Sequence, residues 1–318
     1  MKGLTDIAGL RVGHATNFEA MRGSTVVICE SGAVAGVDVR GSASGNAELE
    51  TLRPRHVTDR IHGVVLTGGS AFGLEAASGV RRYLEARGIG FRMGSAVVPI
   101  VPCAVIYDLG IGQAGVRPTR EMGEAAAAAA TTEPVMEGNI GAGAGATVGK
   151  LFGLKQAMKG GLGSATVSLP GGVLVSALVV VNAFGDVRDF ESGKLIAGAR
   201  RAPDSRDLAD TEAEMKRGAR GGASRSNTTL AVVATNAQLG KVQATKLAEM
   251  AHVGLARTIY PVSTMYDGDT VFALSAGPLQ ADLNTLGVAA AEALARSVVR
   301  AVQKAGDLGG VPGLAGRG

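Results

Sequence analysis

The 318-residue sequence has no tryptophan, and only 3% of its residues are aromatic. A core therefore has to be built from alanine, valine, leucine and isoleucine, and a hydrophobic content of 46% supplies enough of them. Cysteine is almost as scarce, since Cys29 and Cys103 are the two in the chain, and both stand among apolar residues. We expect two buried thiols from this pattern, rather than a disulfide or a metal site.

Long apolar runs and concentrated charge are also missing. The longest strongly apolar stretch, 173–181, is about half a membrane span, and residues 1–16 lack the continuous apolar segment of a signal peptide. The formal charge of +4 is spread along the chain, without a run of lysine and arginine interleaved with aromatics. We therefore expect a soluble, cytoplasmic protein that binds neither a membrane nor nucleic acid.

Several familiar motifs are absent or incomplete. The stretch EGNIGAGAGATVGK resembles a phosphate-binding loop at 144–150, but the next residue, Leu151, has no hydroxyl to bind magnesium. The four histidines lack a metal-binding spacing, and there is no G-x-S-x-G turn for an α/β-hydrolase triad. We expect neither a metal nor an organic cofactor, and we retain Lys150 as a residue at the edge of a pocket.

Glycine, by contrast, is abundant, with 48 residues that follow no Gly-X-Y period. This excess indicates tight turns and close backbone packing. Short, mostly valine-rich runs recur between the glycines, and three longer stretches have apolar residues at helical spacing. Together they predict layered α/β structure, with sheets covered on both faces. The predicted strands lie at 25–29, 63–67, 165–169, 173–181, 230–234 and 270–274, and the predicted helices at 72–87, 241–257 and 283–304.

The segment from Arg200 to Asn227 differs from the rest of the chain because it is rich in charged residues and has few large apolar ones. We expect it to be solvated and flexible. It leads directly into the apolar strand that begins with Asn227, Thr228 and Thr229. A flexible segment followed at once by a rigid strand is the arrangement that self-cleavage needs, and a threonine-rich strand start is the alternative interpretation.

Thr228 has the chemistry for such a cleavage. A threonine hydroxyl is a weak nucleophile until a base accepts its proton, and a free α-amine on the same residue can be that base. The amine exists only after the preceding peptide bond is cut. The hydroxyl of Thr228 could cut that bond by attacking the carbonyl of Asn227 and taking over the acyl group, which water would then release.

The chain resembles the DmpA-type aminopeptidases, a family of self-processing N-terminal-nucleophile hydrolases, and especially their endo-type nylon-oligomer hydrolase branch. The similarity covers most of the sequence. The motifs that carry it are, in order, LTDIAGLRVGHAT, LTGGSAFGLEAASGV, SAVVPIVPCAVIYDLG, EGNIGAGAGATVGK, LVVVNAFGDV, NTTLAVVATNAQL and DGDTVFAL.

The resemblance implies the site. It makes Thr228 the nucleophile, and the bond between Asn227 and Thr228 the one that is processed. Asp269 would lie beside the amine and hydroxyl of Thr228, with Asp267 supporting it. A carboxylate can hold an ammonium or accept a proton, and an amide or ammonium can stabilise an oxyanion. The residues that would line the same site are Lys150, Asn182 and, facing the substrate, Tyr107.

One departure affects the choice of substrate. The aminopeptidases that give the family its name use serine and lack the paired aspartates, whereas this chain has Thr228 and the Asp-Gly-Asp of the nylon-oligomer branch. The resemblance therefore implies a threonine amidohydrolase that acts on small peptides or linear amides through an acyl-enzyme. Hydrolysis of 6-aminohexanoate oligomers as the main activity is the first alternative. An acyltransferase, as in the similarly folded ornithine acetyltransferases, and a non-catalytic binding protein are the others.

The resemblance also implies the architecture. The fold would be a four-layer αββα sandwich with the nucleophile at the start of a central strand. Residues 1–318 would form one domain, processed into an α-fragment 1–227 and a β-fragment 228–318 that stay together. Members of the family assemble as homo-oligomers, often tetramers, so we expect a tetramer of αβ units.

Overall fold

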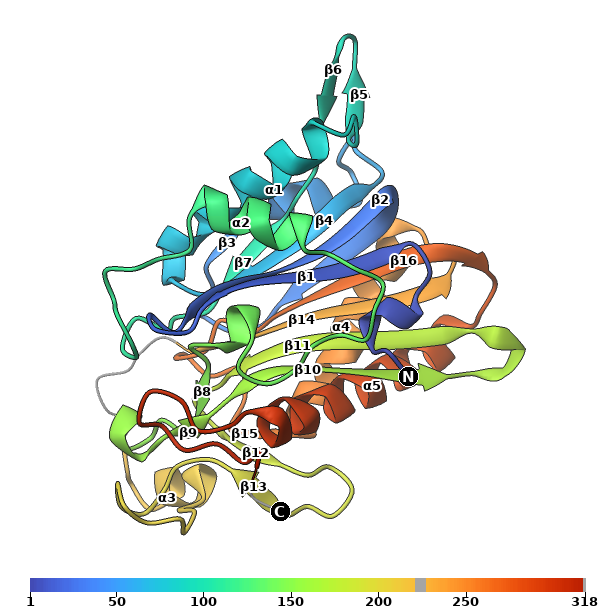
Figure 1. Cartoon of the computed structure of the whole chain (residues 1–318). Helices are drawn as coiled ribbons and strands as arrows, with labels where there is room; N and C mark the ends of the chain where they lie inside the picture. Colours follow the sequence, from blue (N-terminus) through green and yellow to red (C-terminus); the bar gives the residue numbers. More distant parts are fainter. Residues whose placement is uncertain (221–226, 317–318) are drawn as a thin grey trace.

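The computed structural model describes residues 1–220 and 227–316, and at its centre one long strand belongs to two sheets (Figure 1). This strand, β2 (Arg22–Val39), pairs through its first part with β1 (Leu10–Asn17) and β4 (Ile61–Thr67), and through its second part with β16 (Thr270–Leu279). β2 thus joins the two sheets. The full order is β10 (Gly161–Ser168), β11 (Leu174–Asn182), β14 (Thr228–Ala237), β16, β2, β4, β7 (Cys103–Val105) and β3 (Asn46–Ala47).

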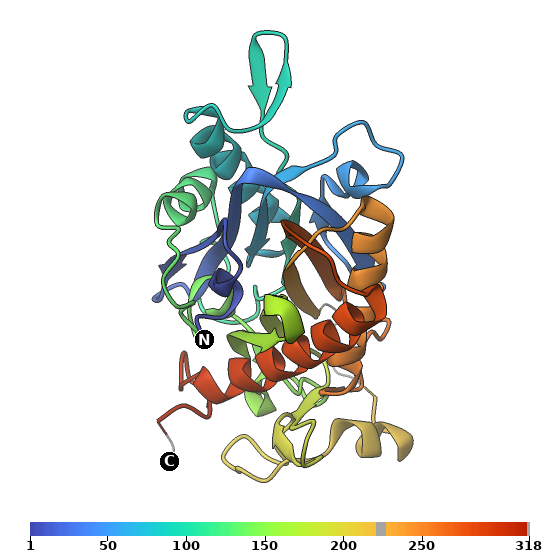
Figure 2. The ribbon, with the colours of Figure 1, turned by 90° about the vertical axis from the view of Figure 1, so that its right-hand side faces the viewer.

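Helices cover the outer face of each sheet (Figures 1 and 2). On one side, α1 (Ala76–Glu85) and α2 (Arg120–Ala128) pack on β1, β2 and β4. On the other, α4 (Lys241–Ala256) and α5 (Leu283–Lys304) pack on β2, β10, β11 and β16. The order helix, sheet, sheet, helix confirms the predicted αββα sandwich.

The strand β14 shows why the sequence contains uninterrupted apolar runs. Leu230 and Val232 pack in the core between the two sheets, whereas Ala231 and Val233 pack in the core under α4 and α5. Successive side chains of a strand point to opposite faces, and both faces of β14 are covered, so the run from Leu230 to Ala234 is apolar without interruption. Cys29 and Cys103 are buried free thiols, as expected.

Glycine permits the close contact between these layers. A Cβ on Gly163 of β10 would lie 2.1 Å from the carbonyl oxygen of Ser297 in α5, so only hydrogen fits there. Close packing at a glycine also accompanies a boundary that differs from the prediction, the start of the helix predicted at 72–87. Residues 70–75 form a 3-10 helix, in which a Cβ on Gly73 would lie 1.9 Å from the carbonyl oxygen of Gly68, and α1 begins only afterwards.

Small elements complete the fold. A hairpin of β5 (Phe91–Met93) and β6 (Ala96–Val98) projects from the body (Figure 1). None of the helices in the described part of the chain is both long and apolar enough to cross a membrane. The remaining strands and the short helix are β8 (Thr147–Val148), β9 (Met158–Lys159), β12 (Asp186–Arg188), β13 (Leu195–Ala197), β15 (Ile259–Tyr260) and α3 (Thr211–Lys216).

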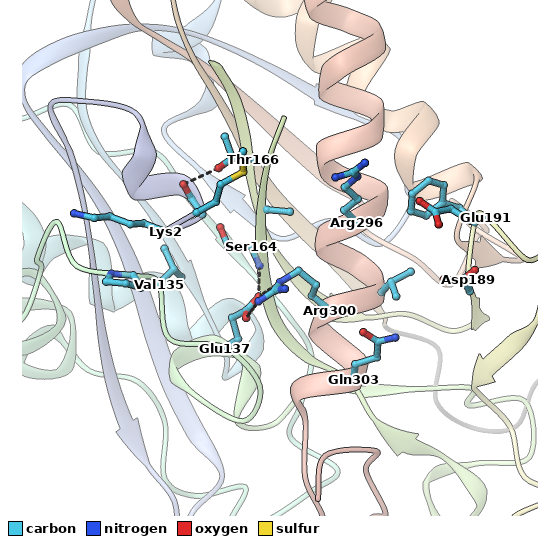
Figure 3. A pocket seen from close by; sticks show the side chains of 16 residues that line it. Lys2, Val135, Glu137, Ser164, Thr166, Asp189, Glu191, Arg296, Arg300 and Gln303 are labelled. Atoms are coloured by element: carbon cyan, nitrogen blue, oxygen red, sulfur yellow. Dashed lines mark hydrogen bonds and ion pairs between the residues drawn. The ribbon is translucent and has the colours of Figure 1, made fainter. Parts of the chain in front are cut away.

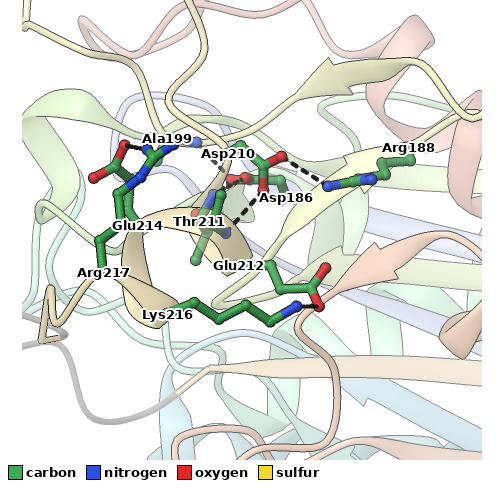
Figure 4. A network of polar contacts seen from close by, with 10 residues as sticks. Asp186, Arg188, Ala199, Asp210, Thr211, Glu212, Glu214, Lys216 and Arg217 are labelled. Carbon is green, nitrogen blue, oxygen red and sulfur yellow. Dashed lines mark hydrogen bonds and ion pairs between the residues drawn. The ribbon is translucent and has the colours of Figure 1, made fainter.

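The charged segment 200–227 is less solvated than the sequence predicted. Asp186 of β12 is buried and accepts hydrogen bonds from the backbone and the hydroxyl of Thr211, at 2.5 and 2.7 Å (Figure 4). Asp210 caps the start of α3 and pairs with Arg188 at 2.9 Å. Arg200, Thr211 and Asn227 are buried, so the prediction is wrong at these positions, whereas most of residues 201–220 are exposed or half-buried. Residues 221–226 of the segment lie outside the described part.

Candidate active site

Three neighbouring strands, β11, β14 and β16, have ends that meet on one side of the sheet that they share. β11 runs antiparallel to β14, and its last residue, Asn182, pairs with Thr228, the first residue of β14. β16 runs parallel to β14 and also starts at this edge, after Asp267 and Asp269. Asn227 forms an isolated parallel bridge with Asp267. This topology brings together five predicted site residues from three distant stretches of the sequence.

The peptide bond before Thr228 is held by hydrogen bonds on both sides. Thr228 is only 2% exposed, and its hydroxyl donates to the carbonyl oxygen of Asn227 at 2.6 Å. The same oxygen accepts the N–H of Gly268 at 2.7 Å, and the N–H of Asn227 donates to the carbonyl of Tyr266 at 2.7 Å. A donor aimed at a carbonyl oxygen polarises it and stabilises the oxyanion that forms when the carbon is attacked.

Asp269 lies next to the start of β14, but its contact is with the second threonine. One carboxylate oxygen accepts the N–H of Thr229 at 2.7 Å, and the other accepts the N–H and hydroxyl of Ser263 at 3.0 and 3.1 Å. Burial, and then the charge of Asp267, raise the pKa of Asp269 to about 7. A carboxylate with this pKa can accept or give up a proton near neutral pH.

Asp267 supports the same loop from within. Its carboxylate accepts the N–H of Phe184 at 3.1 Å, and the N–H and hydroxyl of Thr264 at 3.1 and 2.6 Å. Burial raises its pKa as well. Ser263, which holds Asp269, has a left-handed backbone with φ of 52°. Backbone strain of this kind persists where the surrounding contacts fix the conformation. Here Asp269 holds Ser263, and Asp267 holds the next residue, Thr264.

Lys150 and Asn182 form the opposite wall. The ammonium nitrogen of Lys150 donates to the side-chain oxygen of Asn182 at 2.8 Å and to its backbone carbonyl at 3.0 Å. The amide nitrogen of Asn182 donates to the carbonyl of Tyr107 at 3.0 Å. Lys150 is 2% exposed, and burial lowers its pKa to about 7 although Asp267 opposes the shift. These hydrogen bonds therefore fix the orientation of the side-chain amide of Asn182.

Tyr107 reaches this wall through its backbone, while its side chain is 37% exposed. A cavity of about 10 Å³, room for about one water molecule, lies beside it. Lys150 lines this cavity, as the sequence predicted for a lysine at a pocket edge. The other residues around it are Asp108, Gly110, Ile111, Thr147 and Leu154.

A second group of buried charges, which was not predicted from the sequence, lies next to the site. Arg22 and Asp108 are fully buried and lie 3.5 Å apart, and buried Lys159 donates to the carbonyl of Ala144 at 2.7 Å. Burial lowers the pKa of Lys159 to about 7 and raises that of Asp108. Arg22 and Lys159 lie outside the motifs that carry the resemblance, and Asp108 lies in one of them, next to Tyr107, without a predicted role. Ser263, Thr264 and Gly268 were also missed, although they lie within seven positions of Asp269.

A much larger pocket, of about 750 Å³, lies elsewhere, between the N-terminus, β10 and α5 (Figure 3). There Glu137 accepts hydrogen bonds from Arg300 at 2.8 Å and from the backbone of Ser164 at 2.9 Å. None of the seven predicted site residues lines this pocket.

Comparisons with known proteins identify the family of the chain. The family described as peptidase family S58 matches residues 2–315. The chain belongs to this family. An uncharacterized aminopeptidase of Mycobacterium tuberculosis is 39% identical over 98% of this chain and 96% of its own length. A 6-aminohexanoate-oligomer endohydrolase of Kocuria sp. (strain KY2) is 31% identical over 94% of this chain and 85% of its own length.

Solved structures of two aminopeptidases share the fold. A β-aminopeptidase from Burkholderia sp. has a TM-score of 0.70 and 25% identity, and the match covers 99% of this chain and 91% of that one. The L-aminopeptidase D-Ala-esterase/amidase from Ochrobactrum anthropi, described as a variant among Ntn-hydrolase folds, has a TM-score of 0.74 and 21% identity over 98% and 88%. The protein is thus a hydrolase of peptide or amide bonds with an Ntn-hydrolase fold.

Proposed function

We propose that the protein is a threonine amidohydrolase that activates itself by cutting the bond between Asn227 and Thr228. The observation that carries the proposal is the environment of that bond. The carbonyl of Asn227 accepts the N–H of Gly268 at 2.7 Å, and the hydroxyl of Thr228 lies 2.6 Å from the same oxygen. Nucleophile, scissile carbonyl and oxyanion donor are therefore adjacent in the uncleaved chain.

Self-processing then has two steps. The Thr228 oxygen attacks the carbonyl carbon of Asn227, a C–O bond forms, the C–N bond breaks, and the hydroxyl proton ends on the nitrogen of Thr228. Water next hydrolyses this ester, which leaves a carboxylate on Asn227 and restores the Thr228 hydroxyl beside a free α-amine. Asp269, held one residue away, is the group that transfers the proton.

Substrate turnover repeats this chemistry with an external amide. The α-amine of Thr228 accepts the hydroxyl proton, the substrate's acyl group becomes an ester on Thr228, and the leaving amine takes the proton. Lys150 and Asn182 face the opposite side of the site and stabilise the oxyanion, while Tyr107 contacts the substrate. Small peptides are the favoured substrates, and 6-aminohexanoate oligomers, on which the Kocuria relative acts by name, are the alternative.

The two fragments stay in one folded unit because the cut lies inside the sheet. β14 would begin the β-fragment, yet it pairs with β11 of the α-fragment over eight registered positions, Val175 to Asn182. The core under α4 and α5 also takes side chains from both fragments. Separation would expose these apolar surfaces to water.

A denaturing gel tests the proposal. Processed protein should show bands of roughly 23 and 9 kDa, in proportion to 227 and 91 of the 318 residues of the 31.9 kDa chain. Thr228→Ala should remain one band and stay inactive. The matched control is Thr229→Val, since the buried hydroxyl of Thr229 makes no hydrogen bond with the described residues. A cleaved and active Thr228→Ala variant would overturn the proposal.

A further inference from the structure

The ester of self-processing and the acyl-enzyme of turnover are the same chemical species, an acyl group on the oxygen of Thr228. They differ only in the acyl group, which comes from Asn227 in the first case and from the substrate in the second. Both esters are attacked by water in the same site. The groups that hold Asn227 in the uncleaved chain therefore mark the place where a substrate's acyl group has to be held, provided that the proposed function is right.

Asn227 is held mainly by its backbone. It is fully buried, its N–H donates to the carbonyl of Tyr266 at 2.7 Å, and its carbonyl accepts the N–H of Gly268 at 2.7 Å. Its side chain is held less closely. The amide nitrogen donates to the carbonyl of Tyr266 at 3.2 Å, and the amide oxygen is buried without a hydrogen-bond partner among the described residues. The site therefore binds the main chain of Asn227 more closely than its side chain.

We propose that the backbone of Tyr266 and Gly268 forms a subsite for an α-aminoacyl unit. The carbonyl of Tyr266 accepts an N–H of the substrate, and the N–H of Gly268 donates to the carbonyl that Thr228 attacks. In Asn227 the nitrogen and the carbonyl carbon are separated by one carbon atom, and this spacing satisfies both contacts. The subsite thus selects α-peptide substrates within the proposed activity.

The same geometry disfavours longer amino acids. A 6-aminohexanoyl unit has five carbon atoms between its nitrogen and its carbonyl, so it can make both contacts only by folding back, which costs the freedom of several rotatable bonds. An acyl unit without an N–H leaves the buried carbonyl of Tyr266 unpaired, and that loss costs roughly 1–3 kcal/mol, or about 5- to 150-fold. The contact needs an N–H but no charge, since Asn227 makes it as an amide.

Cleavage itself favours emptying the subsite. It converts the carbonyl of Asn227 into a carboxylate, next to Asp267 in the bridge and close to Asp269. Like charges in a buried site repel, so the new C-terminus is driven out. The donor on Gly268 and the acceptor on Tyr266 belong to the β-fragment and remain beside Thr228.

Four p-nitroanilides with the same leaving group test the subsite on the processed wild-type enzyme: alanyl, 3-aminopropanoyl, 6-aminohexanoyl and propanoyl. Release of p-nitroaniline gives kcat/KM for each. The alanyl compound should have the highest kcat/KM. The propanoyl compound, which has no N–H for Tyr266, and the 6-aminohexanoyl compound, which reaches Tyr266 only by folding back, should each be lower by at least about fivefold, with the 3-aminopropanoyl compound in between. Equal or faster turnover of the propanoyl or the 6-aminohexanoyl compound would overturn the proposal.

A processing assay provides a second test that needs no external substrate. Asn227→Ala keeps both backbone contacts, whereas Asn227→Pro has no N–H for Tyr266. Processing of the proline variant should be at least about fivefold slower than that of the alanine variant. Equal rates would contradict the subsite alone. Absence of processing in wild-type protein would contradict the proposed function, so the two failures are distinguishable.

Discussion

Two groups of buried charge lie side by side in this molecule, and they are built differently. In the first, around Thr228, both oxygens of Asp267 and both oxygens of Asp269 accept hydrogen bonds. In the second, Arg22 and Asp108 face each other at 3.5 Å. There two nitrogens of Arg22 and one oxygen of Asp108 make no hydrogen bond with any described residue.

This difference indicates that the group around Thr228 takes part in the reaction, whereas the group of Arg22 and Asp108 contributes to stability. Hydrogen bonds on every carboxylate oxygen hold a group in one orientation, which is what a proton-transfer site requires. A buried pair with unpaired atoms gives no such control and makes removal of either partner costly. We therefore expect changes in the first group to alter processing and turnover, and changes in the second to alter the free energy of unfolding.

The largest effect should come from Asp269→Asn. An amide can still accept the N–H of Thr229, but it cannot take a proton from Thr228, so processing should slow by about 10²- to 10⁴-fold. Because the pKa of Asp269 is raised to about 7, more than half of its carboxyl groups are ionised only above that pH. Wild-type processing should therefore accelerate between about pH 6 and 8.

Precursor made by cell-free synthesis allows both points to be measured, by following the gel bands over time at each pH. Asp269→Asn should lose the pH dependence along with most of the rate. A variant that processes at the wild-type rate, or with the same pH profile, would remove Asp269 from the chemistry.

The same contrast explains what could be predicted from the sequence. Thr228, Asp267 and Asp269 stand in two short motifs, NTTLAVV and DGDTVFAL, and the periodicity of the runs behind them also indicated the strands. The layered fold followed from apolar runs covered on both faces. A motif can be matched because its residues act together on one substrate and are adjacent in the chain.

Arg22, Asp108 and Lys159 could not be predicted, because only the folded topology brings them together. Arg22 begins β2, Asp108 follows β7, and Lys159 ends β9, so no local pattern links them. The role of Ser263 was hidden for another reason. A serine in a loop is ordinary, and only its left-handed backbone and its two contacts with Asp269 show what it does.

Stability should respond most in the second group. Arg22→Met leaves Asp108 without its partner, and breaking a fully buried pair costs about 3–5 kcal/mol. Asp108→Asn should cost more, because Asp108 can protonate when it is left alone but an arginine cannot lose its proton. Urea unfolding at pH 7 measures both. If both variants unfolded like wild type, the pair would have no role in stability.

Two buried lysines offer a matched comparison between the groups. Lys150→Met removes the two hydrogen bonds that the Lys150 ammonium donates to Asn182, and it should lower kcat by about 10²- to 10³-fold, as expected for loss of an oxyanion donor. Lys159 is equally buried, and its pKa is also lowered to about 7, but it donates to Ala144 in the other group. Lys159→Met should therefore change stability more than kcat. Similar losses of kcat in Lys150→Met and Lys159→Met would contradict the distinction between a catalytic group around Thr228 and a stabilising group around Arg22 and Asp108.

The smallest effect should come from Ser263→Ala, which tests how finely Asp269 is controlled. The hydroxyl of Ser263 donates to the Asp269 carboxylate at 3.1 Å, and a hydrogen bond to the charged form lowers its pKa. Its loss should raise the pKa of Asp269 and shift the pH profile of processing upward, by less than about one unit. Ser263→Gly relaxes the backbone φ of 52° but also lacks the hydroxyl, so it should give the same shift. If the glycine variant kept the wild-type profile while the alanine variant did not, backbone strain rather than the hydroxyl would be the cause.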